Sequence, residues 1–153
     1  MQRKHYALPV RAKDASKLRV GIVISRFNAD ITDNLLCGAR ETLEQWGVKK
    51  ANVHVFHVPG SFELPLGALK LIRKKKLDCI VALGCVIKGE TKHDEYIASA
   101  VSHGFIRLML DHAIPIGFGV ITPNSLAQAK VRSRGKTNKG SEATIAALEM
   151  ALL

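Results

Sequence analysis

Four short apolar runs, separated by longer amphipathic stretches, set the pattern of hydrophobic and polar positions along the chain. Runs of this length that are rich in β-branched residues are typical of strands buried in a parallel sheet. The run "CIVALGCVI" is the clearest buried strand, whereas "NVHVFHV" alternates apolar and polar residues. The predicted strands are residues 18–25, 52–58, 79–87 and 114–122.

The stretches between and after these runs repeat their apolar residues at helical spacing. From Asp30 to Trp46 the apolar positions recur every three or four residues, and Gly47 stands where a helix C-cap belongs. In a later stretch, Ile97, Val101 and other apolar residues share one helical face. The predicted helices are residues 30–46, 64–76, 94–111, 125–133 and 141–153.

The alternation of strand and helix predicts the fold class. Such an order is typical of an α/β protein in which a parallel sheet carries helices on both faces. We therefore expect a three-layer α/β/α sandwich with a four-stranded parallel sheet. A chain of 153 residues suits one domain, here residues 18–153, preceded by a polar N-terminal arm at residues 1–17.

The segments that follow the first three strands collect chemically useful side chains. Ligands of open parallel sheets bind beyond the carboxyl ends of the strands, where these segments meet. There Phe27 offers a flat apolar face, Gly60 allows close approach of the backbone, and Glu63 offers a carboxylate. The sequence therefore predicts one binding site at this edge of the sheet.

The third of these segments adds a proton carrier to a candidate anion site. Gly89 permits a tight or left-handed turn. The helix that begins near residue 92 directs its positive end toward a phosphate. That end favours the neutral imidazole of His93, which is then able to act as a base. The pattern predicts a proton shuttle beside a phosphate.

Each of these residues also has a purely structural interpretation. Thr91 and Asp94 fit a capping box at a helix start, which needs no ligand. His93 is consistent with an ordinary exposed residue in the first turn of a helix. Phe27 is consistent with a loop residue that packs on the core. Glu63 is consistent with an acidic residue in the first turn of a helix, where a negative charge interacts favourably with the helix dipole.

The charge balance narrows the class of partner. The formal net charge of +10, from 23 Lys and Arg against 13 Asp and Glu, favours anions such as nucleic acid, acidic lipid or phosphorylated metabolites. Basic residues crowd positions 130–139, but no aromatic residue lies among them, as binding of single-stranded nucleic acid would require. We expect no nucleic-acid partner.

The cysteines and the hydropathy pattern favour a cytoplasmic protein. Cys37, Cys79 and Cys85 form an odd set that we interpret as reduced, buried thiols. A site made of Cys79, Cys85 and His93 fits no standard zinc spacing, so no metal is expected. The N-terminus lacks the apolar core of a signal peptide, and no stretch is long enough to span a bilayer.

Five blocks, in this order, resemble those of the lumazine synthase family, which acts in riboflavin biosynthesis. They are "SRFN", "VPGSFELP", "GCVIKGETKH", "GFGVIT" and "NKGSEA…ALEM", and together they cover nearly all of the chain after the arm. The resemblance implies a flavodoxin-like topology. It also implies a transferase that condenses 5-amino-6-(D-ribitylamino)uracil with 3,4-dihydroxy-2-butanone 4-phosphate, without any cofactor.

The resemblance also implies roles for individual residues. His93 would move protons. Glu90, Thr91 and Arg132 would bind the phosphate; Arg134 is a second arginine nearby, and the spacing after "QA" favours Arg132. The pyrimidine site would comprise Phe27, Ser61, Phe62, Glu63, Cys85, Val86, Ile87 and Phe118.

Assembly is a further implication. In the family, the counterparts of Phe118 and Arg132 come from the adjacent subunit of a pentamer, and some members build a shell of twelve pentamers. The link "RGKTNKG" at 134–140 has no insertion that favours stopping at the pentamer, and it is one residue short, so both assemblies stay open. Riboflavin synthase is a further expected partner.

The sequence departs from the family pattern at Asp94, because the family usually has an aromatic residue at this position.

Overall fold

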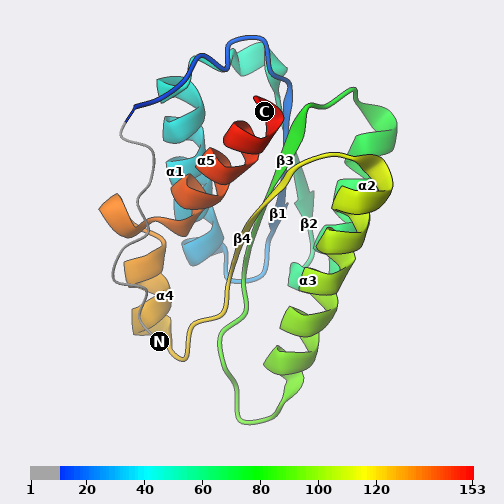
Figure 1. Cartoon of the computed structure of the whole chain (residues 1–153). Helices are drawn as coiled ribbons and strands as arrows, with labels where there is room; N and C mark the ends of the chain where they lie inside the picture. Colours follow the sequence, from blue (N-terminus) through cyan, green and yellow to red (C-terminus); the bar gives the residue numbers. More distant parts are fainter. Residues whose placement is uncertain (1–10) are drawn as a thin grey trace.

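The computed structural model describes residues 11–153 and contains one four-stranded, fully parallel sheet (Figure 1). The strands are β1 (Val20–Ser25), β2 (Val53–Val58), β3 (Cys79–Cys85) and β4 (Ile116–Ile121). Their order is β2-β1-β3-β4, and the register pairs Ile22 with Val55 on one side and with Val81 on the other. The predicted α/β class and the four parallel strands are confirmed.

The five predicted helices are all present, and each end lies within two residues of the predicted one. They are α1 (Ala29–Gln45), α2 (Leu64–Lys74), α3 (His93–His112), α4 (Leu126–Arg132) and α5 (Lys139–Ala151). Three short 3₁₀ turns were not predicted, because three residues carry no periodic signal. They are Lys50–Asn52, Ser61–Glu63 and Gly135–Thr137.

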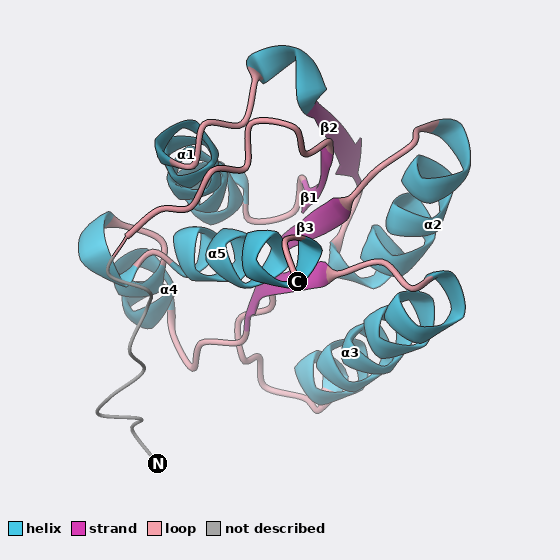
Figure 2. Cartoon of the chain, turned by 45° about the horizontal axis from the view of Figure 1, so that its top comes forward, coloured by secondary structure: helices cyan, strands magenta, loops and turns pink. Residues whose placement is uncertain are grey.

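The helices cover the two faces of the sheet in separate layers (Figure 2). On one face α1, α4 and α5 pack over a core that contains Ile22, Ile24 and Leu35. On the other face α2 and α3 pack over a core that contains Val23, Ala82 and Phe105. Alternate residues of β1 thus enter different cores, as the period of two in a strand requires. This is the expected three-layer sandwich.

The topology opens a crevice between β1 and β3. These strands are neighbours, but β1 leads into α1 on one face while β3 leads into α3 on the opposite face. In open parallel sheets, the point where connections diverge in this way is where ligands bind. In Figure 1 the carboxyl ends of the strands, and hence the crevice, lie at the lower end of the molecule.

Part of the predicted arm lies against the body of the protein. Residues 1–10 lie outside the described part of the chain. Ala15 is buried, and its N–H donates to the carbonyl of Trp46 at 2.8 Å, just after the end of α1. Within residues 11–153, no helix is long and apolar enough to cross a membrane.

One prediction about the cysteines is wrong. Cys79 and Cys85 are buried at the two ends of β3, but Cys37 is exposed. The reason is helical geometry, because Cys37 lies on the outer side of α1, whereas Leu35 and Ala39 face the core. All three thiols are free.

Candidate active site

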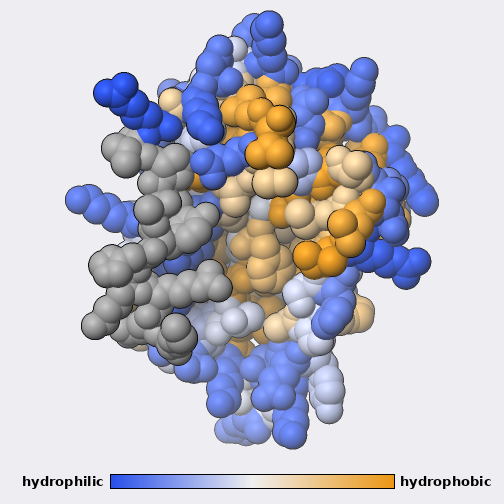
Figure 3. Space-filling view, in the orientation of Figure 1, coloured by the Kyte–Doolittle hydropathy of each residue, from blue (hydrophilic) through white to orange (hydrophobic). Residues whose placement is uncertain are grey.

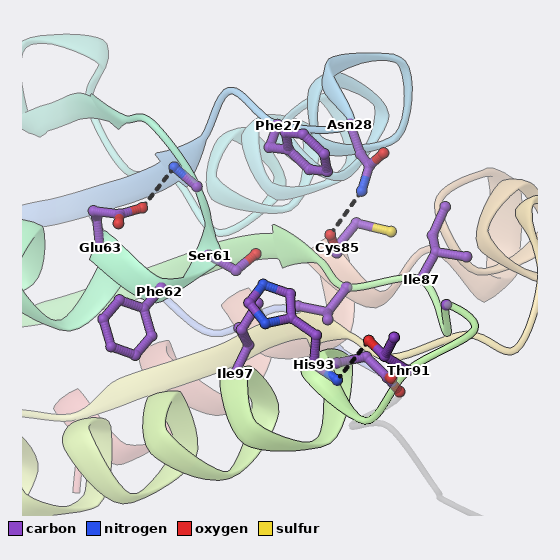
Figure 4. Close-up of a pocket in the computed structure, with 14 residues that line it drawn as sticks. Phe27, Asn28, Ser61, Phe62, Glu63, Cys85, Ile87, Thr91, His93 and Ile97 are labelled. Carbon is purple, nitrogen blue, oxygen red and sulfur yellow. Dashed lines mark hydrogen bonds between the residues drawn. The ribbon is translucent and has the colours of Figure 1, made fainter.

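A cavity of about 490 Å³ occupies the crevice at the carboxyl ends of β1, β2 and β3 (Figure 4). Its volume is in the range of small-molecule sites. The sequence-predicted residues that line it are Phe27, Ser61, Phe62, Glu63, Cys85, Val86, Ile87, Thr91 and His93. Three loops that are distant in the sequence are therefore brought to one place.

The exit from β1 supplies an exposed aromatic face. The side chain of Phe27 is 70% exposed, although its backbone is fixed by an N–H that donates to the carbonyl of Pro59 at 3.0 Å. The interpretation of Phe27 as an anchor packed on the core is therefore wrong. An exposed ring on a fixed backbone is suited to stacking on a flat ligand.

The exit from β2 forms a polar wall. The carboxylate of Glu63 reaches back to accept a hydrogen bond from the N–H of Gly60 at 2.9 Å. Ser61 is buried at the inner side of the wall, whereas Phe62 is exposed. Gly84 makes room for Ser61, because a Cβ atom at position 84 would lie 2.7 Å from the Ser61 hydroxyl.

The exit from β3 runs beside the segment that follows β4. The N–H of Val86 donates to the carbonyl of Ile121 at 2.9 Å, and the N–H of Lys88 donates to the carbonyl of Pro123 at 3.0 Å. Since successive peptide groups of an extended chain face opposite ways, the N–H of Ile87 faces the β1 side. No backbone acceptor for it occurs within residues 11–153.

The buried thiol of Cys85 belongs to the floor of the cavity. Desolvation raises the pKa of Cys85 to about 11, so the group is a neutral thiol near pH 7. A neutral, buried thiol is a poor nucleophile. Cys85 therefore contributes shape and its backbone carbonyl.

The start of α3 differs from the predicted capping box. The helix begins at His93, with Lys92 at the N-cap and no side-chain capping bond. The Thr91 hydroxyl accepts a long hydrogen bond, 3.4 Å, from the N–H of His93. The box between Thr91 and Asp94 does not form, because Thr91 lies one residue before the cap.

His93 combines exposure with a position at the helix start. Figure 4 shows its imidazole directed from the first turn of α3 toward the middle of the cavity. Gly89 is nearby but does not adopt the left-handed conformation that its identity suggested, since the positive-φ glycines within residues 11–153 are Gly47 and Gly135. A Cβ atom at Gly89 would meet no other atom within 4 Å.

Three predicted site residues do not line this cavity within one chain. Glu90 is exposed in the same loop. Phe118 lies on β4 and contacts Phe105, and it keeps 48% of its surface exposed. Arg132 is exposed at the end of α4, where its guanidinium donates a long hydrogen bond to the carbonyl of Gln128.

Several lining residues were missed by the sequence analysis as members of the site. They are Asn28, Asp94 and Ile97. Helical spacing from His93 would have found Ile97, which lies one turn further along α3. No local pattern identifies Asn28, whose side chain contacts a residue 57 positions away.

The described residues offer no metal site. No group of three or more His, Cys, Asp or Glu side chains within residues 11–153 is arranged to hold a metal ion. Cys79 and Cys85 stand at opposite ends of a seven-residue strand, roughly 20 Å apart at the usual rise per residue, so they cannot share one ion.

Comparisons with known proteins identify the family to which the chain belongs. Residues 17–153 match the family model described as 6,7-dimethyl-8-ribityllumazine synthase. The chain is 45% identical over 138 residues to the 6,7-dimethyl-8-ribityllumazine synthase of Parabacteroides distasonis, an alignment that covers 90% of this chain and 86% of the relative. With this coverage and identity, and with the cavity in the β1–β3 crevice, the chain belongs to the 6,7-dimethyl-8-ribityllumazine synthase family of transferases.

Proposed function

We propose that the chain condenses 5-amino-6-(D-ribitylamino)uracil with 3,4-dihydroxy-2-butanone 4-phosphate to give 6,7-dimethyl-8-ribityllumazine, the penultimate step of riboflavin biosynthesis. An amine attacks a ketone, a Schiff base forms with loss of water, phosphate leaves, and the ring closes with loss of water. The observation that carries the proposal is the meeting of Phe27, Ser61 and His93 around one cavity. The reaction needs no cofactor.

The pyrimidine substrate lies against the ends of β1 and β3 in this proposal. Its ring stacks on the exposed face of Phe27, and its polar edge binds the backbone of Cys85, Val86 and Ile87. The free N–H of Ile87 supports this orientation, since a buried polar edge needs a donor. The ribityl chain runs along Ser61, Phe62 and Glu63, which supply hydroxyl, amide and carboxylate partners.

The phosphate lies at the start of α3, near Glu90 and Thr91. The N-terminus of a twenty-residue helix favours an anion there, and the weak bond of Thr91 to His93 leaves its hydroxyl available. Arg132 completes the phosphate site with a planar fork that makes charge-assisted hydrogen bonds.

His93 moves protons between the reacting groups. An imidazole that faces the cavity is able to accept a proton in one step and return it in the next. Holding two reactants in contact supplies much of the remaining acceleration, since the condensation is otherwise bimolecular.

The complete site includes a second copy of the chain. Phe118 and Arg132 lie outside the cavity of their own chain, so an adjacent subunit supplies both. Figure 3 shows apolar side chains gathered on the face that carries β4, and exposed apolar residues of α3, β4 and α5 include Ile106, Phe118 and Met150. Exposed apolar surface of this kind supports an interface between subunits.

The assembly is a homopentamer or a shell of twelve pentamers in the cytoplasm, and riboflavin synthase is the expected consumer of the product.

A condensation assay tests the proposal directly. The two substrates are mixed with the protein, and formation of the fluorescent lumazine is followed. Product should form well above the uncatalysed rate, and His93→Ala should lower kcat roughly a hundredfold or more with little change in pyrimidine affinity. Flavin or lumazine binding without turnover would instead favour a carrier that retains the assembly and lacks catalysis.

A further inference from the structure

The backbone and side chain of Asn28 both depart from what its position favours. Its φ of 60° and ψ of 45° are left-handed, and the other non-glycine residue with positive φ within residues 11–153 is Ala113. Asn28 is also the N-cap of α1, where an Asn side chain ordinarily accepts a hydrogen bond from the first turn. Here it makes no such capping bond.

Instead, the side chain of Asn28 reaches across the crevice. Its Nδ2 donates to the carbonyl of Cys85 at 2.9 Å, as Figure 4 shows. The last β1–β3 pair joins Ile24 to Leu83, so this bond lies beyond the end of the ladder. The side-chain amide of Asn28 thus links the ends of β1 and β3 beyond the last residue pair of the ladder between these strands.

The residue before Asn28 is the exposed ring of Phe27. Its backbone N–H is bound to Pro59 at the end of β2, and the preceding N–H, of Arg26, donates to the carbonyl of Val58 at 2.9 Å. The backbone of Phe27 is therefore fixed to β2 on one side, and the Asn28 amide ties it to β3 on the other. Observed backbone strain at a binding cavity is a recognised sign of function.

We infer that Asn28 is a positioning residue, whose side-chain amide sets the distance between the ring of Phe27 and the backbone of Cys85–Ile87, and so pre-organises the slot for the flat pyrimidine. The inference rests on the proposed function for the identity of the ligand. A slot of fixed width binds a planar ring with less loss of side-chain and loop entropy than a mobile one.

Two substitutions separate the side chain from the backbone strain. Asn28→Gly keeps the left-handed conformation without cost and removes the amide. Asn28→Asp keeps the size but places a carboxylate oxygen opposite the Cys85 carbonyl, which repels it. The matched control is Asn34→Ala, on the same helix, where the Nδ2 that is removed donates to the carbonyl of Asp30 at 2.7 Å.

Hydrogen exchange of the ligand-free protein tests the positioning without any activity. In Asn28→Gly and Asn28→Asp, the amides in peptides spanning 25–32 and 84–88 should exchange faster than in the unmodified protein. Asn34→Ala should leave the 84–88 peptide unchanged. Unchanged exchange of both peptides in both Asn28 variants would overturn the inference, whether or not the protein binds the pyrimidine.

A double-mutant cycle tests whether Asn28 acts through Phe27. By titration calorimetry, Asn28→Gly should raise the Kd for 5-amino-6-(D-ribitylamino)uracil about fivefold to tenfold, the equivalent of roughly one hydrogen bond. In a Phe27→Ala background the same change should matter less than about twofold. An equal loss in both backgrounds means that Asn28 contacts the ligand directly, and this too overturns the inference.

The two proposals fail in different ways. If the unmodified protein does not bind the pyrimidine, the proposed function falls, and the exchange experiment alone decides whether Asn28 holds the strand ends. If the unmodified protein binds it and Asn28→Gly binds it equally well, the positioning role falls and the proposed function stands.

Discussion

The ring of Phe118 meets the ring of Phe105 edge-on, with centroids 6.1 Å apart and planes at 71°. Phe105 is buried on α3, whereas Phe118 keeps 48% of its surface exposed on β4. Edge-to-face contact is the geometry that aromatic pairs prefer, so the exposed ring is held by its buried neighbour. Phe118 therefore presents a fixed apolar surface away from the cavity of its own chain.

Complementation between two defective chains tests the shared site. Co-expressed His93→Ala and Arg132→Ala chains should regain about a quarter of the unmodified activity at low phosphate substrate, because random assembly joins an intact His93 to an intact Arg132 at about one interface in four. The measurement is the rate of lumazine formation by the co-purified mixture. Activity no greater than that of the separately purified variants would show that one chain supplies the whole site.

The two neighbouring arginines should separate in their effects. Arg132→Ala should raise the KM for 3,4-dihydroxy-2-butanone 4-phosphate roughly tenfold to a hundredfold, because it loses charge-assisted hydrogen bonds worth about 1.5–3 kcal/mol. Arg132→Lys should recover part of this loss, since the charge remains but the planar fork does not. The matched control, Arg134→Ala, should change this KM by less than about twofold. If Arg134→Ala raised this KM more than Arg132→Ala did, the phosphate-binding role would belong to Arg134.

The buried thiols should destabilise the protein at alkaline pH. Burial raises the pKa of Cys79 to about 12 and that of Cys85 to about 11, both above the ordinary value of 9.0. Below pH 9 both states keep the proton. Between pH 9 and each raised pKa, the thiol loses its proton in the unfolded chain but keeps it in the folded protein. The free energy of unfolding therefore falls, by up to about 1.4 kcal/mol per pH unit for each thiol.

Urea unfolding at pH 7, 9 and 10.5 measures this loss, and the comparison with Cys79→Ala isolates it from other titrating groups. The variant is less stable at pH 7 but should lose less between pH 9 and 10.5. Equal losses in the two proteins would contradict the assignment.

In the folded protein at pH 7, an alkylating reagent should modify the exposed Cys37 well before the other two thiols.

Two glycines should respond differently to the same substitution. At Gly140, a Cβ atom would collide with the backbone carbonyl of Leu35, where α5 packs closely on α1. Gly140→Ala should therefore lower the free energy of unfolding by on the order of 3 kcal/mol. At Gly89 there is open space, and Gly89→Ala should leave stability within about 0.5 kcal/mol. Thermal unfolding of both variants checks the contrast, and a comparable loss at Gly89 would contradict it.

The sequence predicted the elements well because each core face repeats at the period of its own secondary structure. Element ends were less accurate, since they depend on single side chains. Helix α5, for example, begins at Lys139 because the side chain of Asn138 accepts hydrogen bonds from the N–H groups of Gly140 and Ser141. The hydrophobic pattern alone placed this start at residue 141.

The candidate site was partly predictable for a related reason. In a parallel sheet the strand exits must meet at one edge, so Phe27, Glu63 and His93 could be grouped from topology alone. The bond from Asn28 to Cys85 could not, because it joins residues far apart in sequence through a backbone conformation that the residue types do not reveal. Groups that another subunit supplies, as proposed for Phe118 and Arg132, cannot be predicted from the topology of a single chain.

Asn138 ties three segments together. Its Nδ2 donates to the carbonyls of Asn34 in α1 at 2.9 Å and of Ser133 at 2.8 Å, directly after Arg132, while its Oδ1 caps α5. The surface that would serve a neighbour is therefore anchored independently of the loops that form the chain's own pocket. In the proposed assembly, a substitution of Asn138 would therefore impair the site of the adjacent subunit, to which Arg132 contributes, while sparing the loops of its own pocket.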